Sequence, residues 1–590
     1  GAVAGAMLVF CGLSASLAIE PLTPYEKSNH LETPSYAETM TWLADLAADS
    51  SVLKMGSFGT SPQGRDLPLI IADAGGRFLP ADHMGRSDRV VVLVQACIHG
   101  GESCGKDAGM MLLRNIAAND PSVAGILEKV TLLFIPILNV DGHERFGPYN
   151  RINQNGPREM GWRTNAQNLN LNRDYLKADL LETQSWLDLF DAWLPDFFID
   201  IHSTDGADYQ YPITYHLELF GGMDAGLTEL TTKYRDSMVT KMEADGYPLG
   251  PYVSFRTWHD PASGLKAAPS TPRFSTGYMA LQNRPGLLVE THMLKPYQVR
   301  VDSALKLTTH SLFWCGDNAT ELRNSVLKAD EMAASQIFRA EPYPLTWISD
   351  GDSTSFEFLG VEYDSLTSET TGGQWIKFSE RKSKSVVPFF DSVEPDDSAD
   401  LPEAYLIPPE WSDALARLER HHIDFTRLTV PAEVTVRTWK FSNTQWQSKP
   451  YEGRHPVTFD ATPITETRQF PIGTAVISLN QRSARVIAHL LEPKAPDSLL
   501  YWGFFSPIFT QTEYVESYVI ESMIPTLLAD NPEWATELAA LKASNPDFAA
   551  DPWAIRYWIY AKTPYFDSRV NIYPVASIDE IDQLEQLTHQ

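Results

Sequence analysis

Four short apolar segments between residues 90 and 291 dominate the hydrophobic pattern of this chain. They are VVVLVQAC (90–97), VTLLFIPIL (130–138), DFFIDIH (196–202) and GLLVET (286–291). Runs of consecutive apolar residues, unlike an alternating pattern, are typical of strands that are buried on both faces. We therefore predict four buried strands in this part of the chain.

Helical patterns lie between these strands. One runs from Ser103 to Ala118, with Met110 and Leu113 on its apolar stripe, and another runs from Leu180 to Trp193. Alternating strands and helices indicate an α/β fold whose sheet is covered by helices on both sides. Ligands of such sheets bind at the carboxyl ends of the strands.

The pattern of hydrophobic and polar residues changes after residue 325. Residues 326–400 contain GDSTSFEF, SETTGGQ and DSVEPDDSADLPE, which favour an irregular linker. From residue 401 onward, a helical pattern (411–422), two strand patterns (432–441 and 474–479) and two further helical patterns (514–529 and 532–543) follow. We predict an α/β domain over residues 19–325, a linker over 326–400 and an α+β extension over 401–590.

The first 18 residues carry no charge and end in the small-x-small sequence Ser16-Leu17-Ala18. This pattern favours an export signal. A membrane anchor is the rival interpretation, because about 18 apolar residues is the lower limit for a span. We expect an exported, periplasmic or extracellular protein without a stable membrane span in the mature chain. The four cysteines are too few for a disulfide scaffold, and the sequence does not pair them.

Composition and charge narrow the class of protein. The 590 residues are 43% hydrophobic, which excludes wholesale disorder. Asp and Glu number 76 against 47 Lys and Arg, so the net charge is −29. This balance argues against nucleic acid as a partner, because phosphate backbones bind basic surfaces.

A His and a Glu follow the first predicted strand, in His99-Gly100-Gly101-Glu102. Three residues apart on a loop that enters a helix, the two side chains can face one metal ion. The spacing alone is a weak signal, since His489-Leu490-Leu491-Glu492 repeats it in a region without a partner motif. We interpret that second pair as structural.

Two more ionisable residues end predicted strands. His202 closes the third apolar segment and Glu290 closes the fourth. A catalytic zinc ion has three protein ligands and one open position, so His202 would complete a set with His99 and Glu102. A charged group at the end of a buried strand is costly unless it is paired or functional, which makes Glu290 a candidate catalytic carboxylate.

Residues 149–175 form a long polar stretch, YNRINQNGPREMGWRTNAQNLNLNRDY, between the second and third strands. It is rich in Asn and Arg and has few large aliphatic residues. The stretch is either a solvated loop or a lining of hydrogen-bond donors for an anionic group, because Arg and Asn bind carboxylates well.

Taken together and in this order, His99–Glu102, Asn172-Arg173, His202-Ser203 and Glu290 resemble the motifs of the zinc metallocarboxypeptidase family. The resemblance covers about residues 40–320. It implies a mixed, mostly parallel central sheet flanked by helices. It further implies one zinc ion bound by His99, Glu102 and His202, with Glu290 as the general base.

The resemblance also assigns substrate contacts. Arg163 corresponds to the arginine that stabilises the oxyanion, while Asn172 and Arg173 correspond to the clamp for a free C-terminal carboxylate. Gly101 departs from the pattern, because many members have an Arg there. The family's mobile tyrosine has Tyr278 as its nearest match, with Tyr252 and Tyr297 as alternatives.

The resemblance therefore predicts an enzyme, a zinc metallocarboxypeptidase that removes C-terminal residues from peptides. A zinc amide hydrolase of the same fold, acting on acyl-amino acids or on cell-wall or side-chain-linked peptides, is an alternative. A non-catalytic zinc-binding or peptide-binding protein is an alternative of another class. The preferred terminal residue and the oligomeric state stay open.

Overall fold

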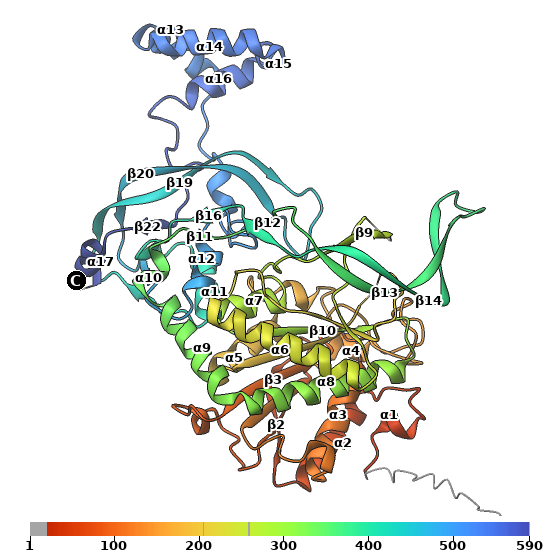
Figure 1. The fold of residues 1–590 in the computed structure, drawn as a ribbon. Coiled ribbons are helices and arrows are strands. Elements are labelled where there is room, and N and C mark those ends of the chain that lie inside the picture. Colours follow the sequence, from red (N-terminus) through yellow and green to blue (C-terminus); the bar gives the residue numbers. More distant parts are fainter. Residues whose placement is uncertain (1–20, 205, 258–259, 589–590) are drawn as a thin grey trace, which may run out of the picture. The chain divides into compact units, whose positions relative to one another are not determined.

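The computed structural model describes residues 21–588 except residues 205, 258 and 259 (Figure 1). The predicted export signal at 1–18 lies outside this range. The chain forms two compact units. The first comprises the described residues up to Ser335, then Pro344–Ser398 and Arg420–His422. The second comprises Gln336–Tyr343, Ala399–Glu419 and the described residues from Ile423 onward.

An eight-stranded mixed sheet forms the centre of the first unit. Its order is β1-β2-β4-β3-β5-β10-β6-β7. The four middle strands are parallel and coincide with the four apolar segments of the sequence. The prediction of a mixed, mostly parallel sheet is thus confirmed. The strands are β1 (Leu53–Thr60), β2 (Asp66–Ala72), β3 (Val90–Ala96), β4 (Val130–Ile135), β5 (Phe197–Thr204), β6 (Ile213–His216), β7 (Leu249–Pro251) and β10 (Gly286–His292).

Helices cover both faces of this sheet, as predicted. The larger ones are α2 (Tyr36–Ala48), α3 (Cys104–Ala117), α5 (Leu181–Trp193), α6 (Ala225–Ala244), α8 (Tyr297–Asp317) and α9 (Ala319–Ala333). Shorter ones are α1 (Pro24–Lys27), α4 (Val140–Glu144), η3 (Leu171–Arg173) and α7 (Ser275–Leu281).

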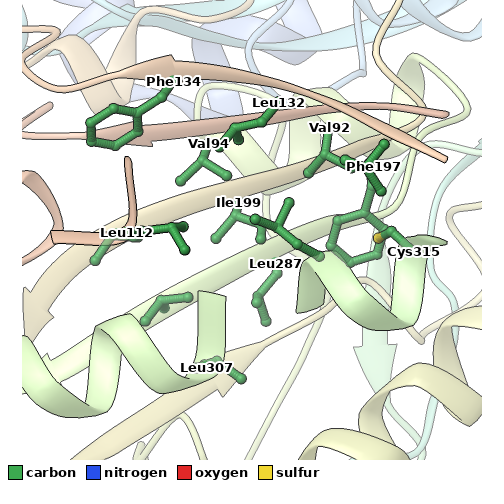
Figure 2. Packing of buried hydrophobic residues seen from close by; sticks show 14 of the residues in the cluster. Val92, Val94, Leu112, Leu132, Phe134, Phe197, Ile199, Leu287, Leu307 and Cys315 are labelled. Carbon is green, nitrogen blue, oxygen red and sulfur yellow. The ribbon is translucent and has the colours of Figure 1, made fainter. Parts of the chain in front are cut away.

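Neighbouring residues of β5 show which helices pack against the two faces of the sheet. Phe197 and Ile199 belong to the core cluster that includes Leu112 of α3 and Leu307 of α8 (Figure 2). The intervening Phe198 contacts Trp186 of α5, with ring centroids 5.8 Å apart. Each large apolar side chain buried in this way contributes about 1.5–3 kcal/mol, so continuous apolar strands are stable only between two helical layers.

The polar ends of these apolar strands meet at one edge of the sheet. His99 and Glu102 lie in the turn between β3 and α3, while His202 lies in β5 and Glu290 in β10. Glu290 is the register partner of His202 on the adjacent parallel strand. The sheet topology therefore brings residues from three distant parts of the sequence to one place.

The predicted linker over residues 326–400 is wrong. α9 extends to Ala333, and residues 354–390 form a long hairpin of β13 (Thr354–Thr367) and β14 (Gln374–Phe390). The hairpin joins β9 (Asp260–Lys266) and β8 (Phe255–Thr257) in a four-stranded sheet of the first unit (Figure 1). Much of its surface is exposed, and this explains the polar composition that favoured a linker.

Two backbone carbonyls anchor the hairpin to the first unit. The Gln210 side-chain amide donates to the carbonyl oxygens of Gly360 and Ser383, at 2.8 and 2.7 Å. Beyond the hairpin, β12 (Trp347–Ser349) pairs with β15 (Val393–Pro395). Most of the supposed linker, including Pro344–Ser398, thus belongs to the unit that carries the metal-ligating candidates.

The second unit contains a six-stranded sheet of order β18-β21-β17-β22-β19-β20. Its strands are β17 (Ala404–Ile407), β18 (Thr426–Arg427), β19 (Ala432–Trp446), β20 (Val457–Phe470), β21 (Ala475–Ser478) and β22 (Ala576–Ile578). Its helices include α11 (Ser412–Arg420), α12 (Ala484–Leu491), α13 (Ser517–Asp530), α14 (Pro532–Ser544), α16 (Pro552–Tyr560) and α17 (Ile581–Thr588). An α+β extension is therefore present, with the predicted strands and helices close to their expected positions. None of the described helices has the length and apolarity that a membrane span requires.

Candidate metal centre

Three buried side chains converge at the carboxyl edge of the central sheet. Their ligand atoms, from His99, Glu102 and His202, all lie within 4.8 Å of one another. His99 Nδ1 is 3.0 Å from Glu102 Oε1, and His202 Nδ1 is 3.2 Å from Glu102 Oε2. Two imidazoles and one carboxylate form a donor set that suits zinc and leaves a coordination position open.

The far nitrogen of each imidazole lies close to a polar side chain. His99 Nε2 lies 3.0 Å from Asn170 Oδ1, and His202 Nε2 lies 2.8 Å from Asp200 Oδ2. Asp200 in turn accepts hydrogen bonds from Gln95 Nε2 at 2.9 Å and Ser275 Oγ at 2.6 Å. Such partners fix the tautomer and orientation of a metal-binding His, so both Nδ1 atoms are directed to the centre.

Two arginines from the polar stretch face Glu102. Arg151 Nη2 is 2.6 Å from Glu102 Oε1, and Arg163 Nη1 is 3.6 Å from the same oxygen. Burial disfavours the charge of Glu102, but His99 and Arg151 hold its pKa well below the ordinary value. The carboxylate is therefore ionised, as a metal ligand must be.

Gly101 leaves the space through which Arg151 reaches this carboxylate. A Cβ atom on Gly101 would lie 2.4 Å from the Gly161 carbonyl oxygen and 2.7 Å from Arg151 Cγ. Both distances are too short for any side chain. The departure from the family pattern at this position is thus matched by an arginine that comes from elsewhere in the sequence.

Glu290 is buried beside the candidate metal ligands, and one of its carboxyl oxygens, Oε2, has no hydrogen-bond partner among the described residues. Burial raises the pKa of Glu290 to about 8, against the opposing effect of His202. A buried, unpartnered carboxyl oxygen is costly, and such groups cluster at functional sites.

Asn172 and Arg173, the candidates for a carboxylate clamp, lie on η3. The backbone N–H of Ser275 donates to Asn172 Oδ1 at 3.1 Å, which fixes the amide. The Arg173 guanidinium lies over the Phe274 ring, 4.3 Å from its centroid. The two side chains therefore present a fixed pair of donors.

A cavity of about 820 Å³ connects all of these groups. It is lined by seven of the eight side chains singled out from the sequence, namely His99, Glu102, Arg163, Asn172, Arg173, His202 and Glu290. A cavity with convergent polar groups and a buried carboxylate of raised pKa has the features of an active site.

The eighth residue, Tyr278, does not line the cavity. It is fully buried, and its hydroxyl lies 2.8 Å from His421 Nδ1 and accepts from Gln282 Nε2 at 2.6 Å. Tyr297 is also buried and donates to Asp107 Oδ2 at 2.6 Å. Of the three tyrosines considered, Tyr252 is the one that lines the cavity. Tyr278, the nearest match by sequence distance from Glu290, thus lies outside the cavity lining, whereas Tyr252, which precedes β8 and β9, lies in it.

The second His–Glu pair lies in the other unit. His489 and Glu492 are buried, and Glu492 accepts a hydrogen bond from the Tyr405 hydroxyl at 2.6 Å. Within the described part of the chain, His99, Glu102 and His202 form the one cluster that is suited to a metal. A structural role for His489 and Glu492 agrees with these contacts.

Three supporting residues were not identified from the sequence. Asp200 precedes His202 by two positions in a strand, so its place on the same face was open to prediction. Asn170 and Arg151 lie in a stretch without regular periodicity, and no local signal distinguishes them from the neighbouring Asn and Arg residues.

Comparison with known proteins finds a matching family model and several similar carboxypeptidases. Residues 39–264 match the family model described as zinc carboxypeptidase. The chain is 24% identical over 504 residues to "Carboxypeptidase 2" of Trichophyton rubrum, covering 82% of this chain and 86% of that protein. It is 24% identical over 473 residues to "Carboxypeptidase 2" of Trichophyton equinum, covering 77% and 80%.

Solved structures of similar proteins include a metallo-carboxypeptidase from Pseudomonas aeruginosa. It aligns with a TM-score of 0.37 and 19% identity, over 50% of this chain and 71% of that chain. A metallo-carboxypeptidase from Burkholderia cenocepacia aligns with a TM-score of 0.36 and 17% identity, over 48% and 70%.

Proposed function

Because this chain belongs to the zinc carboxypeptidase family and is a metallocarboxypeptidase, we propose that it releases single residues from the free C-terminus of peptides. The observation that carries the proposal is the unpartnered, buried Oε2 atom of Glu290. It shares one cavity with a three-donor metal centre and with the carboxylate clamp.

His99, Glu102 and His202 would hold one zinc ion, because their donor atoms are close, buried and oriented by Asn170 and Asp200. When bound, zinc polarises the scissile carbonyl and makes a water molecule more acidic. Side chains of the protein carry out the other steps of the reaction.

Glu290 acts as the general base and then as the general acid. It takes a proton from the attacking water while the new C–O bond forms, and it returns that proton to the amine when the C–N bond breaks. Burial raises the pKa of this carboxyl group, so its ionised form is a stronger base toward the attacking water.

Arg163 stabilises the negative charge that develops on the carbonyl oxygen. Its side chain is 43% exposed, and its guanidinium lies 3.5 Å from His99 Nδ1. Because this cation lies at the edge of the metal centre and is partly exposed, it can approach an oxyanion and stabilise its charge.

Asn172 and Arg173 bind the terminal carboxylate of the peptide. The planar guanidinium and the amide offer parallel donors, and the Phe274 ring restricts the arginine. Their role is to position the last peptide bond, and this makes the enzyme an exopeptidase. Tyr252, half-buried at the cavity wall, takes the substrate-contacting part that the sequence gave to Tyr278.

We also propose that the protein is exported, on the basis of the uncharged, small-residue segment at 1–18. Cys97, Cys104 and Cys315 are free and buried, so the described cysteines do not require an oxidising compartment.

Paired substrates test the proposed function. A peptide with a free C-terminal carboxylate and the same peptide as its amide are incubated with the zinc-loaded protein. The acid should lose its last residue, and the amide should react at least about a hundredfold more slowly, because it cannot pair with Arg173. Equal rates would contradict the exopeptidase assignment. Release of an acyl group from N-acylated amino acids, without peptide cleavage, would favour the amide hydrolase instead.

A further inference from the structure

The cavity lining carries more basic than acidic side chains, whereas the whole chain carries more acidic ones. The whole sequence has an excess of acidic residues, with a net charge of −29. The cavity lining, however, holds six Lys or Arg side chains and three carboxylates: Arg151, Arg163, Arg173, Arg235, Arg256 and Lys266 against Glu102, Glu290 and Asp391. Both Glu residues belong to the metal centre described above. Cations therefore outnumber the carboxylates that remain.

Three of the cations have no part in the proposed reaction. Arg235 is partly neutralised, since its guanidinium lies 2.8 Å from Asp236 Oδ1. Arg256 and Lys266 are exposed, and within the described residues neither forms an ion pair. Two uncompensated cations at a cavity wall attract anionic groups, and more strongly than they would on a neutral open surface.

A short sheet holds these two cations side by side. Lys266, at the end of β9, is the register partner of Phe390 at the end of β14. The Arg256 guanidinium stacks on the same ring, 4.0 Å from its centroid. The Ala267 N–H donates to the Phe390 carbonyl at 2.9 Å, which closes the contact between the strands. Phe390 is thus a platform for Arg256 and leaves the edges of the guanidinium free for hydrogen bonds.

Arg256 and Lys266 differ from the residues of the catalytic centre in their exposure to solvent. The metal ligands and Glu290 are buried, whereas Arg256 and Lys266 are exposed. A peptide whose last residue is held by the clamp must run outward from the centre to solvent. About 820 Å³ is also more space than a single amino-acid side chain fills. The residues that pass Arg256 and Lys266 are therefore those upstream of the scissile bond.

We propose that Arg256 and Lys266, supported by Phe390, form a subsite for an acidic side chain upstream of the scissile bond. The inference rests on the proposed carboxypeptidase activity and names the substrate class that it favours, peptides with Asp or Glu shortly before their C-terminus. The support comes from the hairpin of β13 and β14, which lies outside residues 39–264 that match the family.

Matched peptides test this subsite. Two series carry Glu or Gln at the second, third or fourth residue from a fixed C-terminal residue, and kcat/KM is measured for each. The intact enzyme should prefer Glu over Gln at one of these positions by about five- to tenfold, as expected for two partly solvated ion pairs. The preference should shrink in 0.5 M salt, because exposed charges are screened.

The double variant Arg256→Gln/Lys266→Gln should bring the Glu/Gln ratio close to one. Arg256→Lys keeps a charge and should retain part of the ratio. Lys328→Gln, an exposed lysine on α9 that is not in the cavity lining, is the matched control and should leave the ratio unchanged.

A Glu/Gln ratio near one at every upstream position in the intact enzyme would overturn the subsite. A ratio that persists in the double variant would also overturn it. Failure to cleave any of the peptides would overturn the proposed function itself, and the subsite with it.

Discussion

His202 and Glu290 are register partners on the adjacent parallel strands β5 and β10. The strand ladder thus fixes the imidazole of a candidate metal ligand beside a buried carboxyl group, and no flexible loop intervenes. Sites built on strands hold their geometry more closely than sites on loops. Substitution of Glu290 should therefore leave metal binding intact, whereas substitution of His202 should lower both metal binding and hydrolysis.

Glu290→Gln should separate metal binding from hydrolysis. Gln keeps the size of the side chain but cannot accept a proton, so kcat should fall by about 10²–10⁴-fold. Zinc content, measured by elemental analysis, should remain close to one per chain because Glu290 is not in the donor set. Turnover of a peptide acid at the rate of the intact enzyme would remove Glu290 from the role of base.

Removal of a zinc ligand should lower the zinc content itself. His202→Ala deletes one of three donors and should lower the zinc content strongly. Asp200→Asn, which weakens the support of His202 Nε2, should reduce zinc affinity by a smaller factor of about 10–100. Competition with a chelator measures both affinities. Unchanged affinity in His202→Ala would exclude this residue from the ligand set.

Gly101→Ala tests the close packing at the metal centre. The added methyl group would meet the Gly161 carbonyl oxygen at 2.4 Å and Arg151 Cγ at 2.7 Å, so the loop that carries His99 and Glu102 must shift. We expect a loss of about 1–3 kcal/mol in unfolding free energy together with weaker zinc binding. Gly56→Ala on β1 is the control, because no atom lies within 4 Å of its Cβ position. Equal effects of the two substitutions would refute the steric explanation.

Arg173→Ala should damage substrate selection more than the chemistry. Loss of the guanidinium removes the main partner of the terminal carboxylate, so kcat/KM for a peptide acid should fall by about a hundredfold. The rate for the corresponding peptide amide should change little, so the ratio of acid to amide should collapse. A variant that keeps this ratio would show that the carboxylate binds elsewhere.

Glu182 predicts a pH dependence of stability. This residue of α5 is buried, and its Oε1 atom accepts a hydrogen bond from Asn165 Nδ2 at 3.4 Å. Burial raises the pKa of Glu182 to about 7, from 4.5 in a model peptide. Between these two pH values the folded chain binds more protons than the unfolded chain, so this group makes stability fall as pH rises.

Glu182→Gln removes that titration. Relative to the variant, the intact protein should lose about 2–3 kcal/mol of unfolding free energy between pH 4 and pH 8. Urea unfolding of both proteins at the two pH values measures the difference. A constant difference across this range would show that the pKa of Glu182 is the same in the folded and unfolded chains.

The central sheet was predictable from sequence because its strands are buried on both faces. In β3 every position is buried, and this constraint produces the continuous apolar segment that marks the strand. The candidate site residues His202 and Glu290 stand out for the same reason, because they are ionisable residues at the ends of such segments. Hairpin β13–β14 lacks this signal, because most of its positions are exposed and any polar residue suits them.

Residues from irregular segments were the hardest to place. Arg151 reaches Glu102 from a loop, across the space left by Gly101, and only the tertiary structure reveals this contact. Tyr278 illustrates the opposite error, because its position close to Glu290 in sequence suggested a substrate contact although its hydroxyl is bonded inside the fold. Sequence distance is informative along a strand but not across loops of unknown path.

The most direct test of carboxypeptidase function is a mass-spectrometric digest of a mixed peptide library with the zinc-loaded protein. We expect products that are shorter by single C-terminal residues, and no such products when Glu290→Gln replaces the intact enzyme. Internal cleavage, removal of acyl groups alone, or an unchanged library at full zinc occupancy would contradict this function.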